Sequence, residues 1–230
     1  MTAAAAALSL APMSSELLPA RVIDLGTREY AEVWAMQREM VAARQRDEIP
    51  DTLILVEHPN VITLGRGAHR ENLVAPGDMP IFEIERGGDV TYHGPGQLVG
   101  YPIFLLREHE RDLHLYLRNL EQALIDALAR FDLPAGRRES WTGVWNRAAD
   151  RKIASIGVAV KRWVTLHGFA LNVSTDLSRF AAINPCGLEA TVMASMSSLL
   201  ERPISLAEVK PVVEQKMAAI FGREFDRAAA

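Results

Sequence analysis

Apolar residues recur along the chain at two different spacings, and the longer spacing predicts three helices. Over residues 30–46 and again over residues 113–131, apolar side chains return every three or four positions, which is typical of an amphipathic helix packed on a sheet. Near the C-terminus, Ser205 and Glu208 form a capping-box pattern for a last helix that runs toward residue 221. Pro211 follows the cap closely, so this helix is expected to start later or to kink there.

Shorter apolar runs predict the strands. Four of them lie at residues 53–57, 61–64, 81–85 and 101–106, with a glycine-rich stretch, 87–100, before the last. Two longer runs rich in Val, Ile, Leu and Phe lie at residues 152–160 and 163–173, on either side of Lys161-Arg162, and predict a hairpin. The chain has neither internal repeats nor a linker long enough to separate domains. The pattern predicts one α/β domain of the α+β type, a mixed sheet packed with helices.

The first residues stand apart from this pattern. Residues 1–16 are rich in Ala and Ser and have no core periodicity, so they are predicted to form a flexible leader to a single domain over residues 17–230. No Lys or Arg precedes Arg21, so the basic region of a secretory signal is missing. No apolar run reaches the roughly 18 residues that a membrane span needs. The expected location is the cytoplasm.

Composition narrows the function classes. The chain has 230 residues, 49% hydrophobic and 23% charged, with a net charge of −4, so it lacks the basic footprint of a nucleic-acid or membrane-surface binder. Its single cysteine excludes an internal disulfide and any multi-cysteine metal site. Its six histidines have no ligand spacing, so no metal is expected.

The most informative stretch runs from Arg86 to Gln97. Its glycines let the backbone turn sharply and approach a ligand, and its interleaved polar side chains could hold a polar head group or a carbonyl. The alternative is a glycine-rich hairpin loop whose polar residues satisfy one another. Neither GxxxxGK[ST] nor a GxGxxG after a strand is present, so a phosphate-binding loop is not indicated.

Three later segments carry candidate chemistry. Cys186, between Pro185 and Gly187, is a potential nucleophile in a sharply turned loop, although a lone cysteine can equally be buried and inert. Lys152 begins an apolar strand that could bury its amine and make it a base, although lysines at strand starts are commonly solvated. The step His167-Gly168 within a strand indicates a bulge or a close backbone approach.

Together these segments resemble the lipoyl(octanoyl) transferase family of lipoate synthesis. The run from Arg86 to His93 followed by Gly-Pro-Gly-Gln is similar to that family's signature loop. The segments 151–157, 167–172 and 184–187 match its later motifs in order and spacing, so the resemblance covers about residues 20 to 222. It implies a fold related to the catalytic domains of biotin and lipoate ligases.

The resemblance also implies roles for individual residues. Cys186 and Lys152 would form a catalytic Cys/Lys dyad, and no cofactor or metal would be needed. The residues expected to line the acyl pocket are Arg86, Gly87, Gly88, Asp89, Val90, Thr91, Tyr92, His93, Ser155, Ile156, Gly157, Gly168, Phe169 and Ala170.

The implied reaction transfers an octanoyl group from acyl carrier protein to a lysine ε-amine, through a thioester on Cys186. The implied acceptors are the lipoyl domains of 2-oxoacid dehydrogenases and the glycine cleavage H protein. Both protein substrates are expected to be acidic near the modified group. Arginines of the middle of the chain, Arg137 and Arg138 among them, would then form a docking patch.

Two other enzyme classes remain open at this point. An ATP-dependent lipoate or biotin ligase of the same fold would form an acyl-adenylate and would not need Cys186. A thiol hydrolase would use water as the acceptor and would pair the thiol with a histidine, for which His93 and His167 are available. A non-catalytic acyl- or biotin-binding module is a third alternative.

Overall fold

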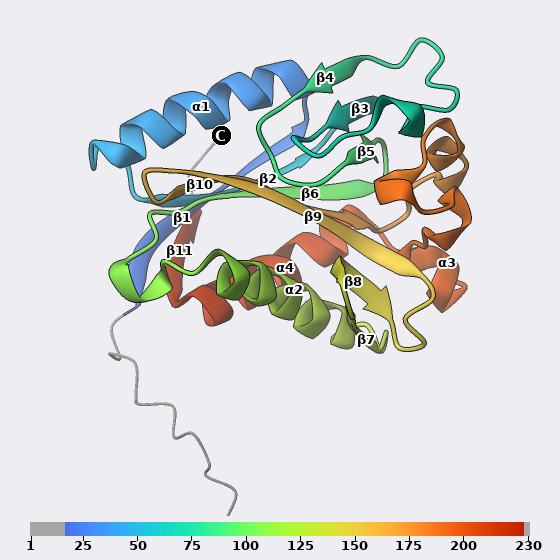
Figure 1. Ribbon diagram of the computed structural model, residues 1–230. Coiled ribbons are helices and arrows are strands. Elements are labelled where there is room, and N and C mark those ends of the chain that lie inside the picture. Colours follow the sequence, from blue (N-terminus) through green and yellow to red (C-terminus); the bar gives the residue numbers. More distant parts are fainter. Residues whose placement is uncertain (1–16, 228–230) are drawn as a thin grey trace, which may run out of the picture.

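Helices cover both faces of a mixed eight-stranded sheet in the computed structural model, which describes residues 17–227 (Figure 1). The predicted leader, residues 1–16, lies outside the described residues. Neighbouring strands follow the order β11-β1-β2-β6-β10-β9-β8-β7. Strand β1 runs parallel to β2 and β11, and every other neighbouring pair is antiparallel, so the predicted mixed sheet is confirmed. The strands are β1 (Leu18–Thr27), β2 (Asp51–Glu57), β6 (Gln97–Ile103), β7 (Ala135–Arg138), β8 (Trp141–Asn146), β9 (Lys152–Lys161), β10 (Val164–Asn172) and β11 (Arg223–Arg227).

A second sheet of three strands stands beside the first. Its order is β4 (Ile81–Glu83), β3 (Val61–Leu64), β5 (Val90–His93). Strand β5 lies within the glycine-rich stretch, and the strand predicted at 101–106 begins earlier, at Gln97, and ends at Ile103. Both segments are buried throughout, so the backbone gains ladder hydrogen bonds there and the tight turn is confined to residues 94–96.

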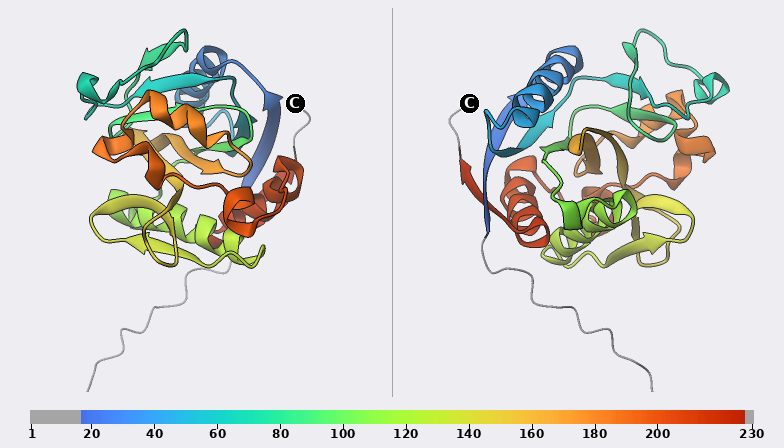
Figure 2. Two further views of the ribbon diagram at one scale, coloured as in Figure 1. Left: turned by 90° about the vertical axis from the view of Figure 1, so that its right-hand side faces the viewer. Right: turned by 60° about the vertical axis from the view of Figure 1, so that its left-hand side comes forward.

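The helices pack as their apolar stripes predict. Helix α1 (Tyr30–Gln45) lies on one face of the large sheet, while α2 (Leu113–Ala129) and α4 (Leu206–Phe221) lie on the other, as Figures 1 and 2 show. The capping box of Ser205 and Glu208 is present, and α4 starts directly after it with Pro211 inside, so the later start is wrong. The short elements are α3 (Met196–Leu200), η1 (Arg70–Asn72), η2 (Glu108–Glu110), η3 (Leu177–Ala182), η4 (Pro185–Gly187) and η5 (Ala190–Val192).

Strands β9 and β10 form the predicted hairpin. Their turn is made by Arg162 and Trp163, both with positive φ, one residue beyond the predicted Lys161-Arg162. Gly157 pairs directly with Gly168 across the hairpin. None of the helices between residues 17 and 227 combines the length and apolar character that a bilayer crossing requires.

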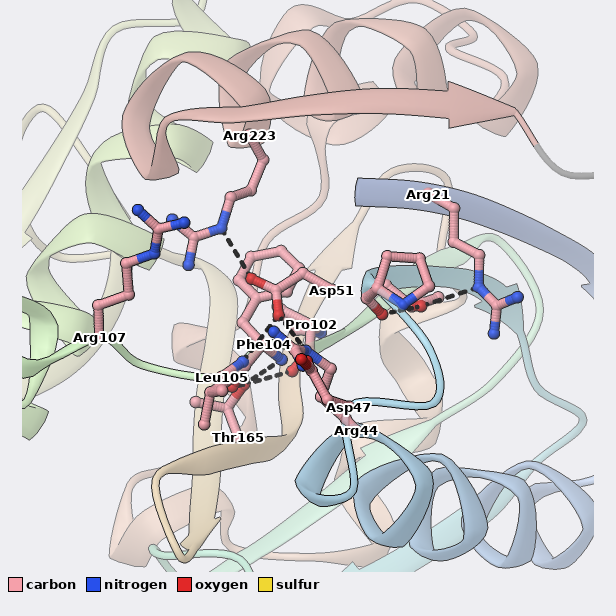
Figure 3. A network of polar contacts seen from close by, with 12 residues as sticks. Arg21, Arg44, Asp47, Asp51, Pro102, Phe104, Leu105, Arg107, Thr165 and Arg223 are labelled. Carbon is pink, nitrogen blue, oxygen red and sulfur yellow. Dashed lines mark hydrogen bonds and ion pairs between the residues drawn. The ribbon is translucent and has the colours of Figure 1, made fainter. Parts of the chain in front are cut away.

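A buried ion-pair network joins the start of β2 to the C-terminal strand β11. The carboxylate of Asp51, at the start of β2, accepts hydrogen bonds from Arg44 Nε and Arg223 Nε at 2.8 Å each, and from the backbone N–H of Leu105 at 2.8 Å (Figure 3). Asp51 and Arg223 are almost fully buried. Arg223 also contacts Glu110 at 2.7 Å, so β11, β2 and η2 are held together by charge.

Replacing Asp51 with alanine is expected to lower the free energy of unfolding by about 3 kcal/mol, because two arginines lose their shared carboxylate in a buried site. Urea denaturation monitored by circular dichroism measures it. The control is Asp24→Ala, which removes the half-exposed pair with Lys210 and is expected to change the free energy by less than about 1 kcal/mol. Equal effects of the two variants would contradict the role given to Asp51.

Candidate active site

A cavity of about 530 Å³ lies between the signature loop, both strands of the β9–β10 hairpin and the start of α2. Most of its surface comes from the motifs singled out in the sequence. The expected site residues that line it are Arg86, Gly87, Gly88, Asp89, Val90, Thr91, His93, Lys152, Ser155, Ile156, Gly157, Gly168, Phe169 and Ala170. Further lining comes from Tyr30, Leu113, Leu117, Tyr101, His167 and the 140–142 segment at the tip of the β7–β8 hairpin.

Arg86 holds the signature loop in place. Its guanidinium donates to the backbone oxygen of Thr63 at 2.7 Å and to the hydroxyl of Thr63 at 3.0 Å, while a third bond goes to the Gly87 carbonyl at 3.0 Å. The loop also docks on β9, because the Gly87 N–H donates to the Val158 carbonyl at 2.8 Å. A Cβ at Gly157 would lie 2.9 Å from the Gly87 oxygen, so the glycine permits this approach.

The segment that carries Cys186 is anchored at both ends. Before the cysteine, the Asn184 N–H donates to the Asn72 carbonyl at 2.8 Å, and the Asn72 side chain donates to Asp89 of the signature loop. After it, the Ala194 N–H donates to the carbonyl of Lys152 at 2.9 Å. The backbone of η4, which includes Cys186, packs against β5. These hydrogen bonds hold the segment of Cys186 close to the signature loop and to β9, although the three are distant in the sequence.

Lys152 is almost fully buried and lines the cavity. Its Nζ lies 5.6 Å from the centroid of the Trp145 ring. Gly143 of the neighbouring strand has φ +129°, and a Cβ there would lie 2.7 Å from Cε of Lys152 and 2.5 Å from the Ala154 oxygen. Gly143 therefore makes the space that the lysine stem occupies.

A buried carboxylate on α2 fixes Gly143. Glu121 is fully buried, and its Oε1 accepts from the Gly143 N–H at 3.0 Å. Its Oε2 accepts from Arg118 at 2.6 Å and from Arg137 at 2.9 Å, so the charge is paired on both sides. Glu121 thus ties the β7–β8 hairpin, and with it the wall around Lys152, to the helix layer.

A cluster of aromatic rings borders the cavity on the α1 side. His58 Nδ1 lies 2.8 Å from the Arg28 carbonyl and its Nε2 lies 2.9 Å from the Tyr101 hydroxyl. Burial lowers the pKa of His58 to about 4, although its bond to the Arg28 carbonyl opposes the shift. Burial also lowers the pKa of His167 to about 4, against the attraction of Glu85. Both rings are therefore neutral near pH 7, which disfavours an ion pair of a thiolate with the His167 imidazolium.

Tyr92 is the one residue of the signature run that the structure places elsewhere. Because side chains alternate along β5, Thr91 and His93 face the cavity while Tyr92 faces the core of the small sheet. Its hydroxyl donates to Asn60 at 2.7 Å and its ring packs against Phe180. Strand periodicity would have shown this, had β5 been recognised as a strand.

The sequence patterns did not mark three residues of the site. In the sequence, Glu121 is one of several polar positions on an amphipathic helix. Gly143 and Trp145 lie in a short strand that the apolar runs did not indicate. A glycine inside the β-rich stretch Trp141–Asn146 was the available signal, since such glycines often mark a close approach. The arrangement as a whole combines a buried amine, a cysteine-bearing turn and a largely apolar cavity, which suits acyl-group chemistry.

Comparison with known proteins agrees with this chemistry. The lipoyl protein ligase A/B catalytic domain profile matches residues 29–218. A curated protein named Octanoyltransferase from Solibacter usitatus is 52% identical over 207 residues, which cover 87% of this chain and 92% of that protein. Proteins of the same name from Gloeobacter violaceus and Geobacter metallireducens are each 50% identical, covering 87% and 81% of this chain and 90% and 86% of theirs.

Solved structures share the fold at low sequence identity. A putative lipoate protein ligase of T. acidophilum, Ta0514 with bound lipoic acid, superposes with a TM-score of 0.75 at 17% identity, covering 93% of this chain and 90% of that one. A lipoate-protein ligase A bound with ATP gives a TM-score of 0.65 at 15% identity, with coverage of 93% and 90%. A biotin protein ligase from Aquifex aeolicus gives 0.52 at 11%, covering 88% and 69%. The expected relation of the fold to lipoate and biotin ligases is confirmed.

Proposed function

Because the chain belongs to the lipoyl protein ligase A/B catalytic domain family and is a transferase of octanoyl groups like its curated relatives, we propose that it works through a thioester on Cys186 with Lys152 as acid and base. One observation carries the proposal. The segment of Cys186 is bonded at its start to the signature loop through Asn72, and at its end to the carbonyl of Lys152. Hydrogen bonds therefore connect the segments that carry the two reactive residues to the loop that lines the acyl pocket.

In the first half of the reaction, the donor thioester passes its acyl group to the cysteine. Lys152 takes the proton of the Cys186 thiol, the sulfur attacks the thioester carbonyl, and the donor thiol leaves with a proton returned by the lysine. One thioester replaces another, so the step is nearly isoenergetic and depends mainly on positioning. The bonded frame around Cys186 and Lys152 supplies that positioning.

In the second half, the ε-amine of a lysine on a lipoyl domain attacks the acyl-Cys186 carbonyl. The C–N bond forms, the C–S bond breaks, Lys152 accepts a proton from the amine nitrogen and a proton returns to the Cys186 sulfur. Thioester to amide is downhill, so the cycle proceeds without ATP. Because both halves need a proton moved at the same atoms, one lysine can serve both.

The apolar side of the cavity suits the acyl chain. Leu113, Leu117, Ile156 and Phe169 line it, and the last three also pack in the core cluster that includes α2. Burial of each methylene contributes about 0.8 kcal/mol to the binding free energy, so an eight-carbon chain gains substantial affinity from these apolar side chains. The sites expected at Ser155–Gly157 and Gly168–Ala170 are thereby assigned to the acyl group.

We place the reaction in the cytoplasm, where the lone thiol stays reduced, and within one catalytic domain over residues 17–230. We assign the donor as octanoyl-acyl carrier protein. The acceptors are lipoyl domains, among them those of 2-oxoacid dehydrogenases and the glycine cleavage H protein. The relatives' name and the lipoate-ligase fold support an acyl-accepting lipoyl domain, and the choice of acyl carrier protein rests on the thioester chemistry of Cys186.

The test is intact mass spectrometry after incubation with octanoyl-acyl carrier protein in the absence of acceptor. The wild type is expected to gain one octanoyl group that hydroxylamine removes, and Cys186→Ser is expected to gain none as a thioester. Adding a lipoyl domain should move the group to its lysine. No adduct on the wild type, together with octanoylation that requires ATP and free octanoate, would instead establish an ATP-dependent ligase. Release of free octanoate without transfer would establish a thiol hydrolase.

A further inference from the structure

A chain of buried amides runs through the centre of the molecule and ends on His93. The Asn172 side chain donates from Nδ2 to the Ala194 carbonyl at 3.1 Å. Gln97 donates from Nε2 to Asn172 Oδ1 at 3.0 Å and to the Tyr92 carbonyl at 3.2 Å. Gln97 Oε1 lies 2.8 Å from Nδ1 of His93. Gln97 and Asn172 are 1% exposed, so water does not compete for these bonds.

The two backbone carbonyls at the ends of this chain decide the direction of every bond in it. A carbonyl only accepts, so Asn172 must present its NH₂ to Ala194 and its oxygen to Gln97. Gln97 must then present its NH₂ to Asn172 and Tyr92, which leaves its oxygen toward the histidine. An amide oxygen only accepts, so His93 carries its proton on Nδ1. Nε2 is left with a lone pair.

That lone pair is on a ring that borders the cavity. His93 lines the cavity, and its Nε2 has no hydrogen-bond partner among the side chains that the structure describes. The ring stacks on Tyr30 with centroids 5.9 Å apart and planes 11° apart, which fixes its orientation. The neighbouring Tyr101 hydroxyl cannot donate to this lone pair. The Nδ1 proton of His58 is directed to the Arg28 carbonyl, so His58 Nε2 is an acceptor and the Tyr101 hydroxyl donates to it.

The ring also stays unprotonated. Burial, followed by the neighbouring His58, lowers the pKa of His93 to about 3, against the bond to Gln97. Nε2 is consequently a hydrogen-bond acceptor that does not itself take the proton near pH 7. A ligand group that fits it must bring an N–H or O–H.

We infer that His93 Nε2 accepts a hydrogen bond from the ε-amine of the incoming lysine, and that Gln97 and Asn172 are positioning residues that hold His93 in the required tautomer. The inference rests on the proposed function, in which only the second half-reaction brings the amine of a substrate to the reacting atoms. As the C–N bond forms, the nitrogen gains positive charge and its N–H groups become stronger donors, so the bond strengthens toward the transition state. Lys152 remains the group that takes the proton.

Two measurements test this, and the first is the tautomer itself. In ¹⁵N-histidine-labelled wild type, the imidazole signals of His93, identified by their loss in His93→Gln, are expected to show a protonated Nδ1 and an unprotonated Nε2. Gln97→Leu removes the acceptor and is expected to move the proton to Nε2. The matched control is Gln37→Leu, another fully buried glutamine, whose oxygen accepts from the backbone of His167 instead. A wild-type ring protonated on Nε2 would overturn the inference.

The second measurement separates the half-reactions. Loading of Cys186 by octanoyl-acyl carrier protein and its discharge to a lipoyl domain are followed by rapid-quench mass spectrometry. Gln97→Leu is expected to slow discharge by on the order of tenfold, the worth of one bond to a group that gains charge, and to change loading by less than about twofold. Gln37→Leu should leave the ratio of the two rates as in the wild type. Equal slowing of both steps, or of neither, would overturn the inference. Failure of the wild type to load Cys186 would instead show that the proposed relay is wrong.

Discussion

Lys152→Met is expected to slow octanoyl transfer by about 10²- to 10⁴-fold, the contribution that a positioned acid or base makes to a reaction. Methionine fills the same buried space between Trp145 and Gly143, so the fold should survive while the proton-transferring amine is lost. Both half-reactions need the amine, so loading of Cys186 and discharge to the lipoyl domain should fall together. Single-turnover mass spectrometry of each step measures this.

The matched control for Lys152→Met is Lys161→Met at the other end of β9. Lys161 is half-exposed, lies 3.4 Å from Glu85 and does not line the cavity. Its replacement is expected to leave both rates within about twofold of the wild type, because an exposed ion pair contributes little. If Lys152→Met were as active as Lys161→Met, another group would have to move the proton.

Periodicity predicted the parts of the fold that bury a continuous apolar face. The helices α1 and α2 and the β9–β10 hairpin agree with their predicted ranges to within a few residues, since each repeats its pattern over at least nine positions. Strand β7, with the sequence AGRR, was missed because it is a short edge strand whose arginines look like a loop. Strands β1 and β11 come from opposite ends of the described chain and pair in parallel, and no local sequence pattern predicts such a contact.

For the site, the local motifs indicated the lining but not its supports. The glycine-rich loop and the segments around Lys152 and Gly168 line one cavity, and their role in binding the acyl group stays a prediction. Glu121 could not be found from the sequence, because its function arises only where α2 meets the β7–β8 hairpin. Arg137 illustrates the same limit of local patterns, since its expected place in a docking patch stays a prediction, while its ion pair with the buried Glu121 was not indicated by the sequence. Charge alone does not reveal which partner a side chain meets.

Gly143→Ala is expected to lower the rate of transfer by about 10²-fold, because a displacement of about 1 Å at a reacting group is enough for such a loss. The added Cβ would lie 2.7 Å from Cε of Lys152 and 2.5 Å from the Ala154 oxygen, at a backbone φ of +129° that alanine rarely adopts. The lysine stem can yield more easily than the strand, so the amine should move. Steady-state transfer to a lipoyl domain measures the loss, at a temperature where circular dichroism shows the variant folded.

Gly136→Ala is the control for Gly143→Ala, because it makes the same change in the same hairpin where a Cβ would meet no atom within 4 Å. It is expected to leave the rate unchanged within about twofold, since open space absorbs the methyl group without displacing a neighbour. If both variants were slowed alike, the hairpin would matter through its general stability. If neither were slowed, the space beside Lys152 would not set the position of the amine. Only a loss of rate that is confined to Gly143→Ala supports the conclusion that the space beside Gly143 sets the position of the Lys152 amine.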